Sequence, residues 1–128
     1  MSVTMKLIED GCILQVVTAD PWTLEDLTSA MHEITTTDDN SPAPRHSLID
    51  VSRTHHLPPG ILRARVHPDL VRMNTGYIVI VGANAIVRTM ANALAMMALS
   101  TRIQHFNTMQ DAMDFIHQVI EAERAIIA

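Results

Sequence analysis

The amino-acid sequence predicts an α/β fold with a mixed, mostly parallel sheet that opens with an antiparallel hairpin. Asp10-Gly11 stands between two apolar segments, which is a strong hairpin signal. The run Tyr77–Val81 is apolar and rich in β-branched residues, as a strand buried on both faces requires. Strand-like and helix-like segments alternate through the rest of the chain. We therefore expect the order β-β-α-β-α-β-α-β-α within a single domain, residues 1–128.

The first third of the chain predicts the hairpin and one helix. Thr4–Glu9 and Cys12–Thr18 are the two strands, the second more continuously apolar. Thr23 is a helix N-cap, and it forms a capping box with Asp26. A polar, proline-bearing loop, residues 35–44, follows the helix. The apolar stripe that faces the sheet consists of Leu24, Leu27, Met31 and Ile34.

The middle of the chain predicts a strand, a loop and an interrupted helix. Ser47–Val51 is a short buried strand, and Ser52–Pro59 is a loop. Gly60–Val66 predicts a short helix that ends near Pro68, because proline has no N–H group and its ring disfavours continuation. A second turn of helix begins at Pro68, since proline is well tolerated at the first helical position.

The last third predicts two further helices separated by a strand. Gly82 ends the apolar strand before it, and a helix runs from Gly82 or Asn84 to about Ser100. Ile103–Phe106 is a short strand, and Thr108 caps the final helix. The buried stripe of that helix consists of Met109, Ala112, Met113, Ile116, Val119 and Ile120.

Composition excludes several classes of function. Aromatic residues make up 3% of the chain and the net charge is −5, so we expect no nucleic-acid partner. The single cysteine, Cys12, excludes an internal disulfide framework and lies in an apolar segment typical of an inert core thiol. No signal peptide is evident, and the longest apolar stretch, residues 83–99, is too short for a membrane span. These observations predict a cytoplasmic protein.

Four segments of the chain together resemble those of a known family. They are Pro21-Trp22-Thr23-Leu24-Glu25-Asp26-Leu27, Leu48-Ile49-Asp50-Val51-Ser52, Tyr77-Ile78-Val79-Ile80-Val81-Gly82, and the spaced residues Phe106, Met109, Ala112, Phe115 and Ile116. With them the chain resembles the SpoIIAA-like group, the STAS domains and their SEC14-type relatives in bacteria. The resemblance spans nearly the whole chain and implies the SpoIIAA-like fold and a regulatory or protein-binding role.

One functional element of that family is missing from the sequence. STAS domains that act as anti-sigma-factor antagonists are phosphorylated on a serine at the start of the second helix, and that serine follows an aspartate and precedes a glycine. The matching positions here are Pro58-Pro59-Gly60, so both the aspartate and the acceptor serine are absent. The resemblance therefore supports the fold but not the family's phosphorylation switch.

The polar residues after the Ser47–Val51 strand are the first candidate site. Asp50, Ser52, His55 and His56 gather at a strand end, where α/β folds bind ligands. The sequence has no GxSxG motif, so we expect no catalytic residues. Although the chain has seven histidines, no HExxH motif or helical i, i+4 pair is present, and we expect no metal site. The absence of GxGxxG and of a Walker lysine predicts no nucleotide cofactor.

The methionine-rich helix after Gly82 is the second candidate. One apolar stripe of this helix consists of Ile86, Val87, Met90, Leu94 and Met97. Arg88 and Asn92 mark the opposite side, which Ala95, Met96 and Leu99 continue as apolar. Such a helix is either buried or offers a patch for dimerisation or a hydrophobic ligand, and the sequence leaves both open.

The sequence supports three ranked hypotheses about function. The first is a non-catalytic regulatory or protein-interaction module, forming a homodimer, whose partner surface combines the loop Ser52–Gly60 with the helix Asn84–Leu99. The second is a SEC14-type carrier of a small hydrophobic molecule, which requires an apolar cavity under that helix. The third is an enzyme, which requires Asp50, Ser52 and a loop histidine within hydrogen-bond reach of one another.

Overall fold

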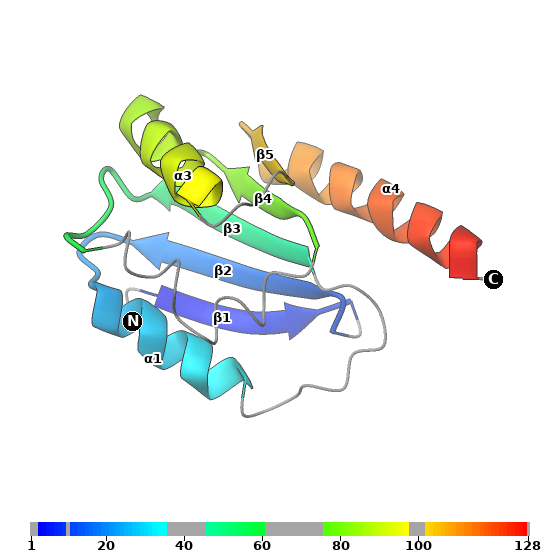
Figure 1. The fold of residues 1–128 in the computed structure, drawn as a ribbon, viewed down its shortest axis with the longest axis horizontal. Helices are drawn as coiled ribbons and strands as arrows, with labels where there is room; N and C mark the ends of the chain where they lie inside the picture. The colour runs from blue at the N-terminus through cyan, green and yellow to red at the C-terminus, as the bar shows by residue number, and fades with distance from the viewer. Residues whose placement is uncertain (1–2, 10, 36–45, 61–75, 98–101, 128) are drawn as a thin grey trace.

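The computed structural model describes residues 3–9, 11–35, 46–60, 76–97 and 102–127, in which five strands form one mixed sheet with the order β1-β2-β3-β4-β5 (Figure 1). The strands are β1 (Val3–Ile8), β2 (Ile13–Ala19), β3 (His46–Arg53), β4 (Ile78–Val81) and β5 (Ile103–Phe106). β1 is antiparallel to β2 at one edge, and all other neighbours are parallel. The predicted α/β class, parallel sheet and antiparallel edge hairpin are confirmed.

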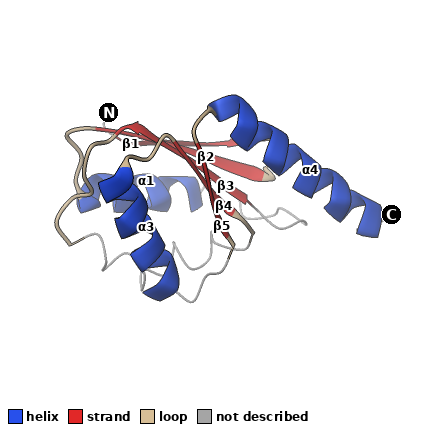
Figure 2. Cartoon of the chain, turned by 90° about the horizontal axis from the view of Figure 1, so that it is seen from above, coloured by secondary structure: helices blue, strands red, loops and turns tan. Residues whose placement is uncertain are grey.

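The helices cover the two faces of the sheet unequally. They are α1 (Leu24–Thr35), α3 (Ala85–Met97) and α4 (Met109–Ile127). In Figure 2, α1 and α3 lie on one face and α4 on the other. α1 connects β2 to β3 and α3 connects β4 to β5, so both crossovers advance in the same direction along the sheet. Right-handed crossovers that advance in the same direction place their helices on the same face of the sheet. α4 follows the last strand and belongs to no crossover, so this rule does not prevent it from covering the other face.

The alternation of side chains along β2 divides the core between these faces. Leu14 and Val16 pack with Met31 of α1, whereas Ile13 points to the opposite face and packs with Ile116 of α4. β2 is therefore covered by helices on both faces, which explains why its sequence is apolar almost without interruption. The α4 cluster also contains Leu48, Val79, Val81, Ala112 and Ile120.

Three sequence predictions fall on residues outside the described ranges. They are the helix Gly60–Val66 with its restart at Pro68, the polar loop after Thr35, and the continuation of the helix beyond Met97 to Ser100.

The predicted two-residue hairpin turn is wrong. Ile8 pairs with Ile13, so the residues from Glu9 to Cys12 form a longer connection. Glu9 has φ of 54° and Gly11 has φ of 86°, and the Gly11 and Cys12 N–H groups donate to Ile8 and Glu9 carbonyls at 3.1 Å. Cys12 consequently lies half-buried in this turn, not within the strand as predicted.

The predicted helix starts are confirmed by their caps. The Asp26 N–H donates to Thr23 Oγ1 at 3.1 Å, and the Thr23 N–H donates to Asp26 Oδ2 at 2.9 Å, which completes the capping box. The Val87 N–H donates to Asn84 Oδ1 at 2.8 Å, and Thr108 caps α4 in the same manner. Asn84, and not Gly82, therefore begins α3.

Two predicted positions need correction. β3 continues to Arg53, so Ser52 belongs to the strand and the loop begins at Thr54. On α3, Ile86 is 64% exposed, whereas Val87 is 1% exposed. Val87 packs against β3 and β4 together with Ala91, so the buried face of α3 is rotated from the predicted stripe. Because Val87 and Ala91 pack against the sheet, Ile86 lies on the outer side of the helix.

Candidate functional site

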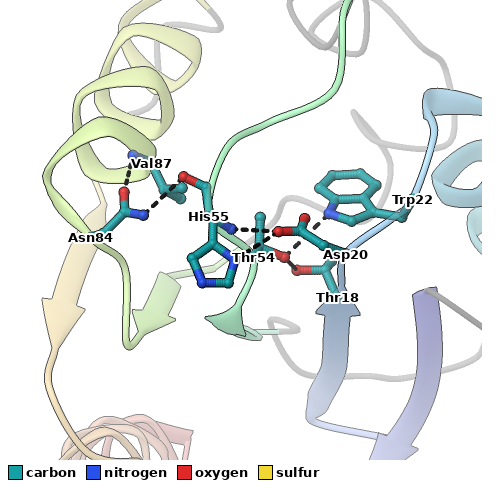
Figure 3. Close-up of polar contacts among 7 residues, drawn as sticks. All are labelled: Thr18, Asp20, Trp22, Thr54, His55, Asn84 and Val87. Atoms are coloured by element: carbon teal, nitrogen blue, oxygen red, sulfur yellow. Dashed lines mark hydrogen bonds and ion pairs between the residues drawn. The ribbon is translucent and has the colours of Figure 1, made fainter.

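The carboxyl ends of β2, β3 and β4 meet at one edge of the sheet, and polar residues follow each of them. Asp20 follows β2, Thr54 and His55 follow β3, and Asn84 precedes α3 after β4. Figure 3 shows these side chains converging from three segments that are far apart in the sequence. This edge is where open α/β sheets bind their ligands.

A buried hydrogen-bond network anchors the start of the loop. The hydroxyls of Thr18 and Thr54 share a hydrogen bond of 2.6 Å, and both side chains are buried. The indole Nε1–H of Trp22 donates to Thr54 Oγ1 at 3.2 Å. Each buried polar group therefore has a partner, and the network fixes the position of the residue that precedes His55.

Asp20 binds His55 through both its main chain and its ring. Asp20 Oδ2 accepts hydrogen bonds from the His55 N–H and from His55 Nδ1, each at 2.9 Å. These two hydrogen bonds lower the pKa of Asp20. The bond from the His55 main chain has the larger effect, and the bond from the imidazole has the second largest. The carboxylate is therefore ionised at neutral pH and accepts both hydrogens.

Asn84 connects this pair to α3. Its Nδ2 donates to the His55 carbonyl at 2.8 Å while its Oδ1 caps the helix. His55 thus has its N–H, its carbonyl and its ring held by neighbours from two other segments (Figure 3).

Asp50 and Ser52 form a separate pair on β3. The Ser52 N–H and hydroxyl donate to Asp50 Oδ1 at 3.0 and 2.7 Å. Gly82 lies against Ser52, because a Cβ built on Gly82 would be 2.8 Å from Ser52 Cβ. Within the described residues, no hydrogen bond joins Ser52 to His55 or His56, so the structure does not bring Asp50, Ser52 and a loop histidine together as the third hypothesis required.

The structure brings together only part of the predicted surface. His55 and His56 are exposed in the loop, and Arg88 and Met96 are exposed on α3, where Met96 is 75% exposed. Asn92 is half-buried and binds His105 Nε2 of β5 at 2.9 Å, so it faces the sheet edge. Leu99 lies outside the described residues.

Sequence reasoning missed the residues that organise this edge. Asp20 was not singled out, and Trp22 entered only as part of a segment that carries the family resemblance. Thr54 was predicted only as part of a loop, and Asn84 only as a helix start. A usable signal was present, since Asp20 directly follows β2 and the carboxyl ends of parallel strands meet at one edge.

The opposite end of the sheet holds a second buried polar contact. The Tyr77 N–H donates to His46 Nδ1 at 2.9 Å, so Nε2 carries the ring hydrogen and donates to Glu123 Oε1 at 2.8 Å. His46 is 0% exposed, and this contact ties the end of α4 to the starts of β3 and β4. Its role is structural.

The described residues contain no group of three His, Cys, Asp or Glu side chains that could hold a metal ion. Among the described helices, none combines the length and apolar character needed to cross a membrane.

Comparison with known proteins identifies the fold. No protein-family model and no curated protein matches the chain. Among solved structures, a serine-to-glutamate variant of RsbS from Moorella thermoacetica matches with a TM-score of 0.60 at 16% sequence identity. The match covers 94% of this chain and 99% of that one. RsbS is a STAS-domain protein, and the chain therefore has the STAS, SpoIIAA-like fold that its sequence resemblance implied.

Proposed function

We propose that this chain is a non-catalytic, STAS-like regulatory or protein-interaction module, a single domain that acts as a homodimer in the cytoplasm. The observation that carries the proposal is the outer face of α3. Ile86 and Met96 are large apolar side chains with 64% and 75% exposure, and they lie within about 80° of each other around the helix. The two side chains lie about 15 Å apart along the helix axis, so a partner that covers both contacts most of the length of α3.

The proposed surface combines this face with the loop that follows β3. Asn84 joins the two, because it caps α3 and binds the His55 carbonyl. The loop therefore has a defined position beside the helix, which reduces the conformational entropy lost on binding. The surface consists of His55, His56, Ile86, Arg88 and Met96. Asp50 and Ser52 lie on the other face of the sheet, because Asp50 pairs with Val81 of the α4 cluster, whereas Val51 between them packs with α3.

The module works, in this proposal, without the phospho-acceptor serine of its relatives. The prolines at 58 and 59 and the glycine at 60 replace the family's acceptor segment. The fold match to RsbS supports a regulatory role, since the two chains share an architecture over nearly their whole lengths.

Light scattering after size-exclusion chromatography tests the dimer. We expect a mass of twice the 14.2 kDa of one chain. Ile86→Lys and Met96→Lys should give monomers that remain folded. The matched control is Ile126→Lys at the end of α4, where the isoleucine is 84% exposed, and this variant should remain dimeric. Monomeric wild-type protein at high concentration, or equal effects at both helices, would contradict the proposed dimer.

A SEC14-type carrier of a hydrophobic molecule is the second candidate. It requires an apolar cavity beneath α3, where Val87 instead packs in one buried cluster with Val51 and Ile80. That packing favours the interaction module. Native mass spectrometry of the purified protein distinguishes the two, because a carrier retains a co-purified lipid-sized molecule.

A further inference from the structure

The His55 imidazole has one nitrogen held by a carboxylate, and its other nitrogen has no hydrogen-bond partner among the residues that the structure describes. Nδ1 lies 2.9 Å from Asp20 Oδ2, and the side chain is 79% exposed. Nε2 makes no hydrogen bond within the described residues. A ring held on one side and open on the other is the arrangement in which histidine acts on an external molecule.

The protonation pattern of this pair follows from the hydrogen bonds. The Asp20 carboxylate only accepts hydrogens, so the neutral His55 ring carries its hydrogen on Nδ1. The lone pair therefore lies on Nε2, the exposed nitrogen. The carboxylate also stabilises positive charge that develops on the ring when Nε2 forms a bond, as in the nucleophile–base–carboxylate arrangements of hydrolases.

The ring is oriented before any reaction takes place. The His55 N–H donates to the same Asp20 oxygen, and the His55 carbonyl accepts from Asn84. The preceding residue, Thr54, is fixed by its buried hydrogen bonds to Thr18 and Trp22. Figure 3 shows the imidazole between the Asn84 and Asp20 side chains. Little conformational entropy is then lost when a donor approaches Nε2.

We propose that His55 is a phosphoryl-accepting histidine whose nucleophilic atom is Nε2 and whose positioning residue is Asp20. The co-substrate class is a small phosphoryl donor with a labile phosphorus–nitrogen bond. The Nε2 lone pair forms the new bond to phosphorus as the phosphorus–nitrogen bond of the donor breaks. The departing nitrogen keeps that electron pair, takes a proton from water and leaves as an amine. The Nδ1 hydrogen stays on the ring, and Asp20 balances the ring's positive charge.

Two other histidines provide internal comparisons. His117 is also paired with a carboxylate, since its Nε2 lies 3.2 Å from Glu9 Oε1, but its main chain lies in the regular helix α4. His56 is exposed beside His55 and makes no hydrogen bond to a carboxylate in the part of the chain that the structure describes. If exposure alone decided reactivity, His56 would react as fast as His55.

Potassium phosphoramidate is the probe. The purified chain is incubated at neutral pH, and the modified position is mapped by intact-mass and peptide mass spectrometry with phosphorus NMR. We expect one acid-labile phosphoryl group, on His55 Nε2, which His55→Gln removes. Asp20→Asn should slow the reaction about tenfold, which is less than the roughly hundredfold lower end of general acid–base effects, because an exposed pair is screened by solvent. His117→Gln should react at the wild-type rate.

The wild-type map alone is decisive, because it needs no variant to fold. Equal labelling of His55 and His56, or an unchanged rate in Asp20→Asn with native circular dichroism, overturns the proposal. The inference goes beyond the proposed function and needs no partner. If the protein dimerises but is not labelled at His55, the inference about His55 is refuted and the proposed dimer is not. If the protein is labelled at His55 but is monomeric, only the proposed dimer is refuted.

Discussion

Replacing Gly82 by alanine would force a methyl group against β3. The added Cβ would lie 2.8 Å from Ser52 Cβ and 3.0 Å from Ser52 Cα, and Gly82 has φ of +76°. A side chain in this left-handed region costs about 1–2 kcal/mol, and crowding in a packed site costs about 1–3 kcal/mol. We therefore expect Gly82→Ala to lower the free energy of unfolding by about 2–5 kcal/mol.

Urea unfolding measures this loss. The chain has a single tryptophan, Trp22, which lies in the buried network at the same edge, so its fluorescence follows the transition. The midpoint should fall while the slope with urea stays unchanged, which indicates a loss of stability and not a change in the unfolded state.

A double-mutant comparison separates the two causes. Ser52→Gly removes the nearest colliding atom, whereas Ser52→Ala keeps it, and both variants lose the same hydroxyl bond to Asp50. The loss of unfolding free energy caused by Gly82→Ala should therefore be smaller in the Ser52→Gly background than in the Ser52→Ala background. We expect the difference to be at least about 1 kcal/mol. Equal costs in the two backgrounds, or a total loss below about 1 kcal/mol, would refute the reasoning.

Three further predictions concern the titratable side chains. His46→Leu should lower the free energy of unfolding by about 2–4 kcal/mol in urea, whereas Glu123→Gln, which still accepts a hydrogen bond, should cost less than about 1 kcal/mol. The pKa of Asp20 lies below its ordinary value of 3.8, so its stabilising contribution is full above that pH and is lost as the pH falls through the lowered pKa. Asp20→Asn should therefore be less stable than wild type at neutral pH, and this difference should shrink in acid titrations as the pH falls below 3.8. Burial first, and Arg88 second, lower the pKa of His105 from 6.5, so NMR titration of Arg88→Gln should show that pKa raised, and an unchanged value would contradict the assigned cause.

Much of the fold could be predicted because local signals decide it. The caps at Thr23, Asn84 and Thr108 satisfy main-chain N–H groups within three residues, so sequence spacing alone locates them. The apolar run ending at Val81 is buried, as its β-branched composition indicated. The hairpin turn was missed because Glu9 adopts a positive φ, which its residue type rarely does.

The candidate site depended on contacts that no local pattern specifies. Asp20 and His55 are 35 residues apart, and Asn84 and His55 are 29 apart. Such pairs form only after the strands have set their register, so the sequence located His55 but not the carboxylate that holds it. The orientation of α3 was also missed, because helical periodicity gives a stripe of residues but not the side that the sheet covers.

The strands stand side by side in the order in which the chain is made. During translation each parallel strand therefore emerges with its pairing partner already synthesised, and the sheet grows in one direction from the hairpin. Among the side-chain hydrogen bonds described above, the one between His46 and Glu123 needs the residue that is synthesised latest, and the two are 77 residues apart. Nascent chains that end before Glu123 leave a buried imidazole without its acceptor, so we expect ribosome-bound truncations to become protease-resistant only once that glutamate has left the exit tunnel.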